Sequence, residues 1–503
     1  MKTCVVSTRI PSGQAAGIYD ILLPVGFGVP KGFVVYSLVN SSAYNAFDNG
    51  TAHVTRSVGF GGSVSTGANV VKSICHWQYS QYNVDPSNTF SSTAFTAAMY
   101  AQNTTAADSR LWWATSFSTD KIAGQYAVNG SVTGNVDMIF TVFGGDDVQC
   151  AVTGVGVTTT AIHNAPTPFQ ADVALMLYNR FAQTTDGELN TGICWRETGA
   201  GSGSTRVRKL VGITQRQQDN VATSSLSTVV QTRLSLLATG AALRPAYMGV
   251  SAIGCTLSGA ATGGTVILLA IKGPTSDDFY VDHFIAPATG TGSSSYITGF
   301  VPQCVLGAFS GAGALDVAAS TTANGSEMSS YFTATGSDPR NNNGLGTITT
   351  STANATVTGS GTSFLYQIGP TDILLTTDGQ SIGTVSSIAS NTSITLTANS
   401  SLTLSAQNFV YVKSQQFAVG FGNLDGDSGT PNEFITGHVS TDALFTYTCS
   451  PGTATNDGNI GNMNGSLNGW TATMSTSTAG PDYGYYLAIK NQDYAKRRRI
   501  INT

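Results

Sequence analysis

The sequence has little charge for its length. Charged residues make up 10% of its 503 residues, against about 25% in an average soluble domain. The net charge of −5 is small, so it gives no argument for binding to nucleic acid or to a membrane. A free monomer usually stays soluble through a denser mix of charges. The scarcity of charge therefore favours a surface that neighbouring proteins largely cover.

Long apolar segments are also missing. The longest strongly apolar run, Val266 to Ile271, is far shorter than the roughly 20 residues that span a bilayer. The N-terminal residues Met1 to Arg9 contain no apolar segment typical of a secretory signal. We therefore expect synthesis in the cytoplasm and no membrane partner.

Metal-binding and cofactor-binding spacings are absent as well. No pair of cysteines has C-x-x-C spacing, and no histidines have H-E-x-x-H or H-x-H spacing, so we expect no metal and no cofactor. Several cysteines stand inside apolar runs, where a buried thiol is the ordinary role. Their odd number leaves open a bond to a neighbouring subunit. The cysteines are Cys4, Cys75, Cys150, Cys194, Cys255, Cys304 and Cys449.

The residues that are present suit stacked β-sheets. Hydrophobic residues make up 41% of the chain, which is not the composition of a disordered protein. Glycine, serine, threonine and small apolar residues fill much of the rest, as expected for strands joined by tight turns. Helical patterns are weak: Phe95 to Gln102 predicts one or two helical turns, and Ser225 to Ala238 fits a helix or a strand equally well.

Several landmarks recur in the same order and indicate an internal repeat. Each copy has a proline-bearing turn followed by an apolar strand, a short valine-glycine landmark, and a closing apolar strand. The landmarks are Val58-Gly59-Phe60-Gly61, Val211-Gly212-Ile213 and Val419-Gly420-Phe421-Gly422. The first two closing strands lead into the pairs Asp146-Asp147 and Asp277-Asp278, and the third is Tyr483 to Asn491.

The repeat predicts an all-β protein made of three tandem β-sandwich-like modules. The delayed landmark of the third module indicates an inserted small β-barrel or sandwich, in which apolar residues alternate and Asp378-Gly379 predicts a hairpin turn. The predicted boundaries are 1–148, 149–276 and 277–491 for the modules, 343–412 for the insert, and 492–503 for a basic C-terminal tail.

One loop of the third module resembles two known motifs. Gly426-Asp427-Ser428-Gly429-Thr430-Pro431 is similar to the nucleophile loop of trypsin-like proteases, but His283 does not have the sequence context of their histidine base. The same loop resembles a calcium loop, yet Thr430 stands where the sharp bend needs glycine. We interpret the segment as a polar turn and predict that the protein is not an enzyme. A hydrolase acting through Ser428 is the alternative.

Two strand-like segments carry neighbouring aromatic residues. Such rings stack on sugars in glycan-binding proteins, although core packing is their more ordinary role in strands. The candidate glycan-facing residues are Trp77, Tyr79, Trp112 and Trp113.

The modules resemble a repeat in structural proteins of tailed bacteriophages and prophages. Three segments carry the likeness: Gly299 to Val305, Gln218 to Thr223, and Tyr486 to Lys490. The insert looks like a small β-module of phage fibre and head-appendage proteins. The resemblance implies a virion protein, either a head decoration or a tail surface or sheath-like subunit, whose partners are copies of itself and other virion proteins. The alternative is a host-recognition fibre protein that binds a cell-surface glycan; a nucleic-acid partner is not expected.

Overall fold

The computed structural model describes most of the chain. The described residues are 1–24, 26–40, 48–49, 53–63, 71–81, 90–94, 96–102, 109–130, 134–158, 160–180, 186–197, 207–218, 226–230, 235–236, 242–258, 263–285, 292–300, 302–310, 326–335, 344–364, 368, 372–378, 380–412, 416–424, 434–440, 460–461, 469–474 and 483–490.

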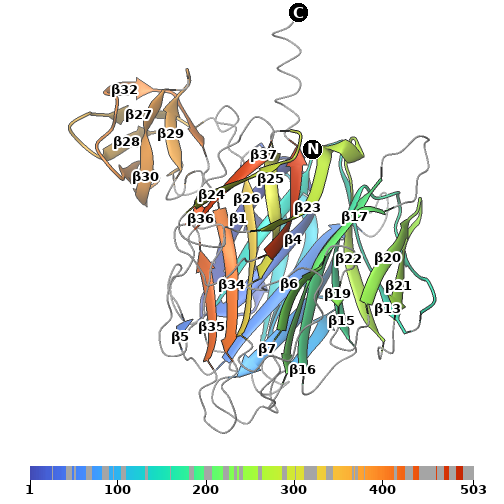
Figure 1. Ribbon diagram of the computed structural model, residues 1–503. Helices are drawn as coiled ribbons and strands as arrows, with labels where there is room; N and C mark the ends of the chain where they lie inside the picture. The colour runs from blue at the N-terminus through green and yellow to red at the C-terminus, as the bar shows by residue number, and fades with distance from the viewer. Residues whose placement is uncertain are drawn as a thin grey trace, which may run out of the picture.

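Strands dominate these residues (Figure 1), and the predicted all-β, sandwich-like fold class is confirmed. A short 3₁₀ turn, η2 (Ser276–Asp278), lies between the second and third modules. The chain forms large sheets of long strands, which we call the inner sheets, and small sheets that cover them, the outer sheets.

The first module builds a six-stranded inner sheet and a small outer sheet. The inner order is β1 (Lys2–Ile10), β12 (Asn135–Gly144), β4 (Pro30–Asn40), β6 (His53–Ser63), β7 (Val71–Gln81) and β8 (Phe90–Ala94). In the outer sheet, β2 (Gly17–Ile18) and β3 (Ile21–Leu22) pair with β11 (Lys121–Asn129), followed by β10 (Ser109–Ser118) and β9 (Met99–Gln102).

The second module repeats this order. Its inner strands are β13 (Gln149–Val157), β22 (Gly264–Lys272), β15 (Val173–Arg180), β16 (Asp186–Arg196), β17 (Val207–Gln218) and β18 (Leu226–Val230). Its outer strands are β14 (His163–Pro166), β21 (Ala252–Ser258), β20 (Ala242–Met248) and β19 (Ser235–Leu236). A single parallel pairing, Ala151 with Ser63, joins the first two inner sheets along β13 and β6.

The third module has the same plan. Its inner strands are β23 (Phe279–Ile285), β38 (Tyr483–Lys490), β25 (Pro302–Ser310), β26 (Ser326–Thr335), β34 (Gln416–Leu424) and β35 (Phe434–Ser440). At its far edge β35 pairs with β5 (Asp48–Asn49), a segment of the first module. Its outer strands are β24 (Gly292–Ile297), β37 (Gly469–Met474) and β36 (Ile460–Gly461).

The insert is a separate β-unit between β26 and β34, two strands that pair directly with each other. Among the described residues, its strands pair only with one another and its buried core contains only residues of the insert. It stands to one side of the three modules (Figure 1). Asp378 lies between the antiparallel strands β29 and β30, as the hairpin signal predicts. The strand order is β32 (Leu404–Gln407), β27 (Thr347–Thr350), β28 (Thr356–Ser360), β31 (Ser393–Leu396), β30 (Ser381–Ser390), β29 (Ile373–Thr376) and β33 (Phe409–Val412).

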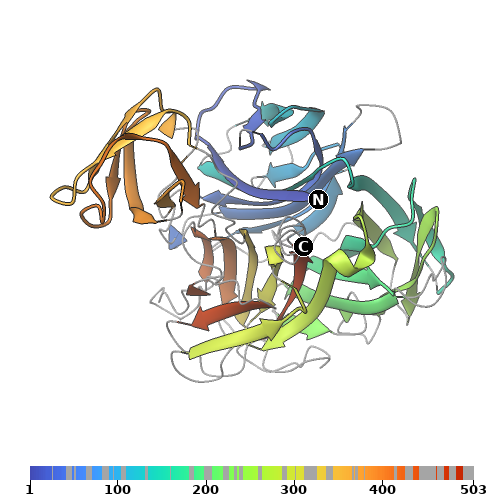
Figure 2. The same cartoon turned by 90° about the horizontal axis from the view of Figure 1, so that it is seen from above.

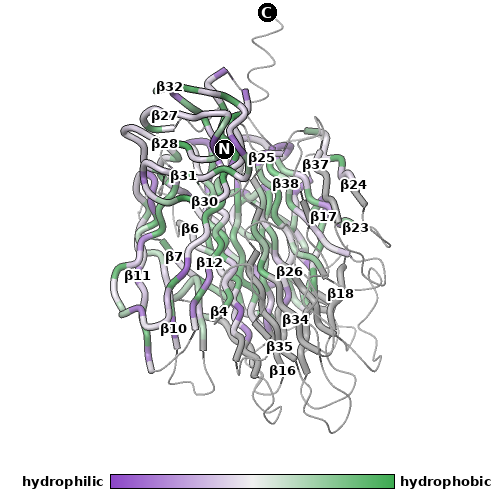
Figure 3. Tube along the Cα trace, turned by 90° about the vertical axis from the view of Figure 1, so that its left-hand side faces the viewer, coloured by the Kyte–Doolittle hydropathy of each residue, from purple (hydrophilic) through white to green (hydrophobic). Residues whose placement is uncertain are grey.

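The three inner sheets surround one common core. Seen from above, they lie around the centre of the molecule (Figure 2). Hydrophobic residues follow the strands in the middle of the molecule (Figure 3). The second strand of each inner sheet is buried on both faces, which explains its uninterrupted apolar run. In β22, for example, Ile267, Leu269 and Ile271 face the common core, whereas Val266, Leu268 and Ala270 face the outer sheet of the same module.

Two details differ from the sequence prediction. The landmark Val58-Gly59-Phe60-Gly61 lies on β6, the fourth inner strand, whereas Val211-Gly212-Ile213 and Val419-Gly420-Phe421-Gly422 lie on the fifth strands β17 and β34. The first landmark is therefore one strand out of step. Glycine occurs on the fourth strand in module one, on the fifth in module three, and on both in module two, where Gly192 pairs with Gly212. A valine-glycine pattern alone could not separate the two strands.

The helical turns predicted for Phe95 to Gln102 were wrong, whereas Ser225 to Ala238, which fitted a helix or a strand equally well, contains strands. The end of the segment Phe95 to Gln102 forms β9, and residues within Ser225 to Ala238 form β18 and β19. Pairing with neighbouring strands decided both, because β9 lies against β10 and β18 lies against β17. Weak local helix propensity yields to such tertiary context.

Candidate functional site at the junction of the three modules

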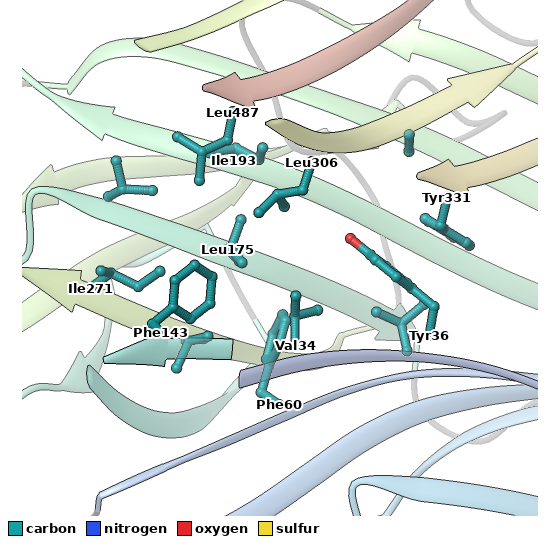
Figure 4. Packing of buried hydrophobic residues seen from close by; sticks show 14 of the residues in the cluster. Val34, Tyr36, Phe60, Phe143, Leu175, Ile193, Ile271, Leu306, Tyr331 and Leu487 are labelled. Carbon is teal, nitrogen blue, oxygen red and sulfur yellow. The ribbon is translucent and has the colours of Figure 1, made fainter. Parts of the chain in front are cut away.

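The common core is the feature to which all three modules contribute. Figure 4 shows Val34, Tyr36 and Phe60 of module one facing Leu175 and Ile193 of module two and Leu306, Tyr331 and Leu487 of module three. Each side chain comes from a strand whose alternate residues point to the module's own outer sheet. Because side chains alternate between the two faces of a strand, one face of every inner sheet packs against the other modules and the opposite face packs against the outer sheet of its own module.

Aromatic and hydroxyl groups connect the modules inside this core. The Tyr36 and Tyr331 rings are stacked, with centroids 5.0 Å apart and planes inclined by 8°. Thr141 Oγ1 of module one donates to Thr333 Oγ1 of module three over 2.8 Å. Each contact joins β4 or β12 to β26, so the third inner sheet is held against the first by directional as well as apolar interactions.

A second buried bond joins modules two and three. Tyr485 on β38 donates its hydroxyl to Thr191 Oγ1 on β16 over 2.7 Å. Burial raises the pKa of Tyr485 well above that of an exposed tyrosine, and burial likewise raises that of Tyr36. Both phenols are therefore protonated at neutral pH, where Tyr485 can act as the hydrogen-bond donor.

At the edge of the core, an ionic seam joins β17 to β23. Lys209 Nζ lies 2.7 Å from Asp282 Oδ1, and His283 Nδ1 lies 2.9 Å from the same oxygen. Burial would raise the pKa of Asp282, but hydrogen bonds from His283 and Lys209 outweigh it and hold this pKa well below its usual range. Asp282 is therefore ionised at neutral pH and tied to a lysine of the preceding module.

The acidic pairs that close the first two modules also form contacts between segments. The amino group of Met1 lies 2.8 Å from Asp147 Oδ1. Lys490 Nζ, at the end of the last strand, lies 3.7 Å from Asp278 Oδ1. The first residue of the chain and the end of its last described strand are thus both anchored beside module boundaries.

The candidate glycan-facing aromatics are not gathered on one surface. Trp112 is 0% exposed, and its Nε1 donates to the Tyr19 carbonyl oxygen over 2.9 Å. Trp77 is 6% exposed and stacks on Tyr100 at 4.7 Å. These two rings pack in the interior of module one. Trp113 is half-buried on β10, and the side chain of Tyr79 lies outside the described residues.

The remaining predictions concern the Ser428 loop, the cysteines, metal binding and membrane spans. Ser428 and the rest of its loop, Cys449 and the basic C-terminal tail lie outside the described residues. The six described cysteines are buried and form no disulfide, and burial raises the pKa of Cys255 and Cys304 to about 12. Within the described ranges, no group of three or more potential ligands could hold a metal ion. No helix in that part of the chain is long and apolar enough to cross a membrane.

Sequence reasoning did not identify the residues that join the modules. Nothing local marks Thr141, Thr191, Thr333, Tyr485 or Lys209, and the shortest separation from a partner along the chain is the 73 positions between Lys209 and Asp282. The only available signal was the uninterrupted apolar run of the closing strands, which shows that both faces are buried without showing against what.

No protein-family model matches the chain, and comparisons with curated proteins and with solved structures find no match either.

Proposed function

We propose that this chain is a structural subunit of a bacteriophage virion, placed on the head as a decoration or on the tail surface, and that it works by packing against other proteins. The observation that carries the proposal is the common core, because it packs the three inner sheets against one another and leaves the outer sheets on the outside. The low charge of the chain and its likeness to phage structural repeats support the same reading. One of the segments that carry this likeness, Tyr486 to Lys490, lies in β38, the second strand of the third inner sheet.

The proposal is tested on virus particles prepared from the source of the sequence. Antibody raised against the purified chain is expected to detect a band among the proteins of purified particles and to label their surface in electron micrographs. Antibody depleted on the purified chain is the control. A stable monomer that is absent from the particle proteins would contradict the proposal.

The second candidate is recognition of a host-cell glycan. It is favoured by the insert, which has its own core and stands apart from the modules, and by Trp113, the one candidate ring described as partly exposed. A glycan array probed with the chain and with Trp113→Ala distinguishes the two functions. A hydrolase acting through Ser428 is a further hypothesis, and unchanged behaviour of Ser428→Ala in a peptidase assay removes it.

A further inference from the structure

Strands β16 and β17 lose their regular register at Arg208. Trp195 pairs with Lys209 and Arg196 pairs with Val207, so Arg208 is an extra residue in the ladder. Such a bulge bends a strand and re-aims a side chain that would otherwise follow the alternation. Here the Arg208 guanidinium carbon lies 4.1 Å above the centroid of the Trp195 ring.

The Trp195 ring beneath this guanidinium is held in place by residues of the second and third modules. Trp195 Nε1 donates to the carbonyl oxygen of Ser276 in the η2 turn over 3.1 Å. The Trp195 ring centroid is 5.7 Å from that of Tyr280 on β23. Because the ring is buried and bonded, it fixes one face of an exposed guanidinium. The N–H donors lie around the edge of that planar group, where an acceptor can reach them.

The charge of Arg208 has no counterpart in the seam beside it. Lys209 is already paired with Asp282, and Lys490 Nζ lies 3.7 Å from Asp278 Oδ1. The ion pairs found among the described residues include none to Arg208. An exposed guanidinium that has no carboxylate partner in the described part of the chain is well suited to bind a carboxylate of another molecule, because the two planar groups form two parallel hydrogen bonds.

We propose that Arg208 anchors a docking site for an acidic segment of a partner protein, with an aspartate or glutamate carboxylate bound to its guanidinium. This inference rests on the proposed function, in which the chain packs against other proteins. A protein carboxylate fits better than an acidic sugar, because the ring directly beneath the guanidinium is already covered. Trp195 lies under the guanidinium, and Tyr486 is buried behind Tyr280.

The test is a titration of the full-length chain with a hexaglutamate peptide, followed through the indole N–H signal of Trp195 by nuclear magnetic resonance. Trp195→Phe assigns that signal, and hexalysine is the charge control. We expect a saturable shift in the unaltered chain and about tenfold weaker binding in Arg208→Ala. Arg208→Lys is expected to fall between them, since it keeps the charge but loses the planar pair of donors. Arg244→Ala, which removes an exposed arginine of β20, is the matched control and is expected to bind like the unaltered chain.

No shift in the unaltered chain, or equal binding by Arg208→Ala, would overturn the site. Tighter binding of trigalacturonate than of hexaglutamate would overturn the assignment to a protein partner. Neither result bears on whether the chain is present in virus particles, so failure of the site and failure of the proposed function are distinguishable.

Discussion

At the scale of single residues, close packing between strands is enforced by glycine. Gly307 lies in the middle of β25, and a Cβ added there would stand 2.0 Å from the Tyr485 carbonyl oxygen and 2.8 Å from the Phe332 ring. The backbone oxygen belongs to the paired strand β38, so it cannot move without disturbing the ladder. Only a residue without a side chain fits this position.

We therefore expect Gly307→Ala to lower the free energy of unfolding by about 1–3 kcal/mol or more, the usual range for overpacking. Gly156→Ala on β13 is the matched control, because a Cβ there meets nothing within 4 Å, and it should change stability far less. Urea denaturation of the two variants checks this. Equal urea midpoints for the two variants would show that strand β25 can accommodate a Cβ at position 307, contrary to this account.

The hydroxyl of Tyr485 allows a second prediction at this scale. Tyr485→Phe removes the hydroxyl that donates to Thr191 and leaves the buried Thr191 hydroxyl without this hydrogen bond. The loss is expected to lower the free energy of unfolding by about 1–3 kcal/mol. Tyr247→Phe, whose hydroxyl bonds Asn164 at an exposed site, should cost much less. A double-mutant cycle with Thr191→Val measures the coupling. Additive effects of the two substitutions would contradict the bond between modules two and three.

At the scale of elements, the ionic seam between β17 and β23 predicts a dependence on pH. The folded pKa of Asp282 lies below its unfolded value of about 3.9, so its charged form favours the folded state. Its contribution is therefore present above pH 4 and is lost as the pH falls toward the folded pKa. Asp282→Asn should be less stable than the unaltered chain at pH 7, with the difference shrinking at pH 3. A difference of the same size at both pH values would exclude this role.

The strands also show how far the sequence could predict the fold. Alternation gave five of the insert's strands, β27, β28, β30, β31 and β33, but not β29 or β32. Apolar runs gave the closing strands β12, β22 and β38, because these patterns are local. The landmark Val58-Gly59-Phe60-Gly61 was placed one strand out of step, since glycine serves equally on the fourth or fifth strand. The short strand β9 was missed because its conformation depends on pairing with β10. Trp112 illustrates the same limit for the candidate site, since nothing local distinguishes a ring on a surface from one under an outer sheet.

At the scale of the whole molecule, the three repeated modules bury one another's apolar faces. A single β-sandwich module has an inner sheet with a second apolar face, and that face stays exposed unless another module covers it. Three modules in one chain cover these faces mutually, and the common core is the result. The tandem repeat was readable from the sequence, whereas the closure of the modules around a centre was not, because it depends on contacts hundreds of residues apart.

The central claim is that the three modules fold as one body and the insert as another. Scanning calorimetry of the full chain, compared with a variant in which residues 344–412 are replaced by a short glycine-serine turn, tests it most directly. We predict one main transition shared by the modules in both proteins, and a separate smaller transition that disappears with the insert. Separate transitions for the three modules would contradict the common core and the function built on it.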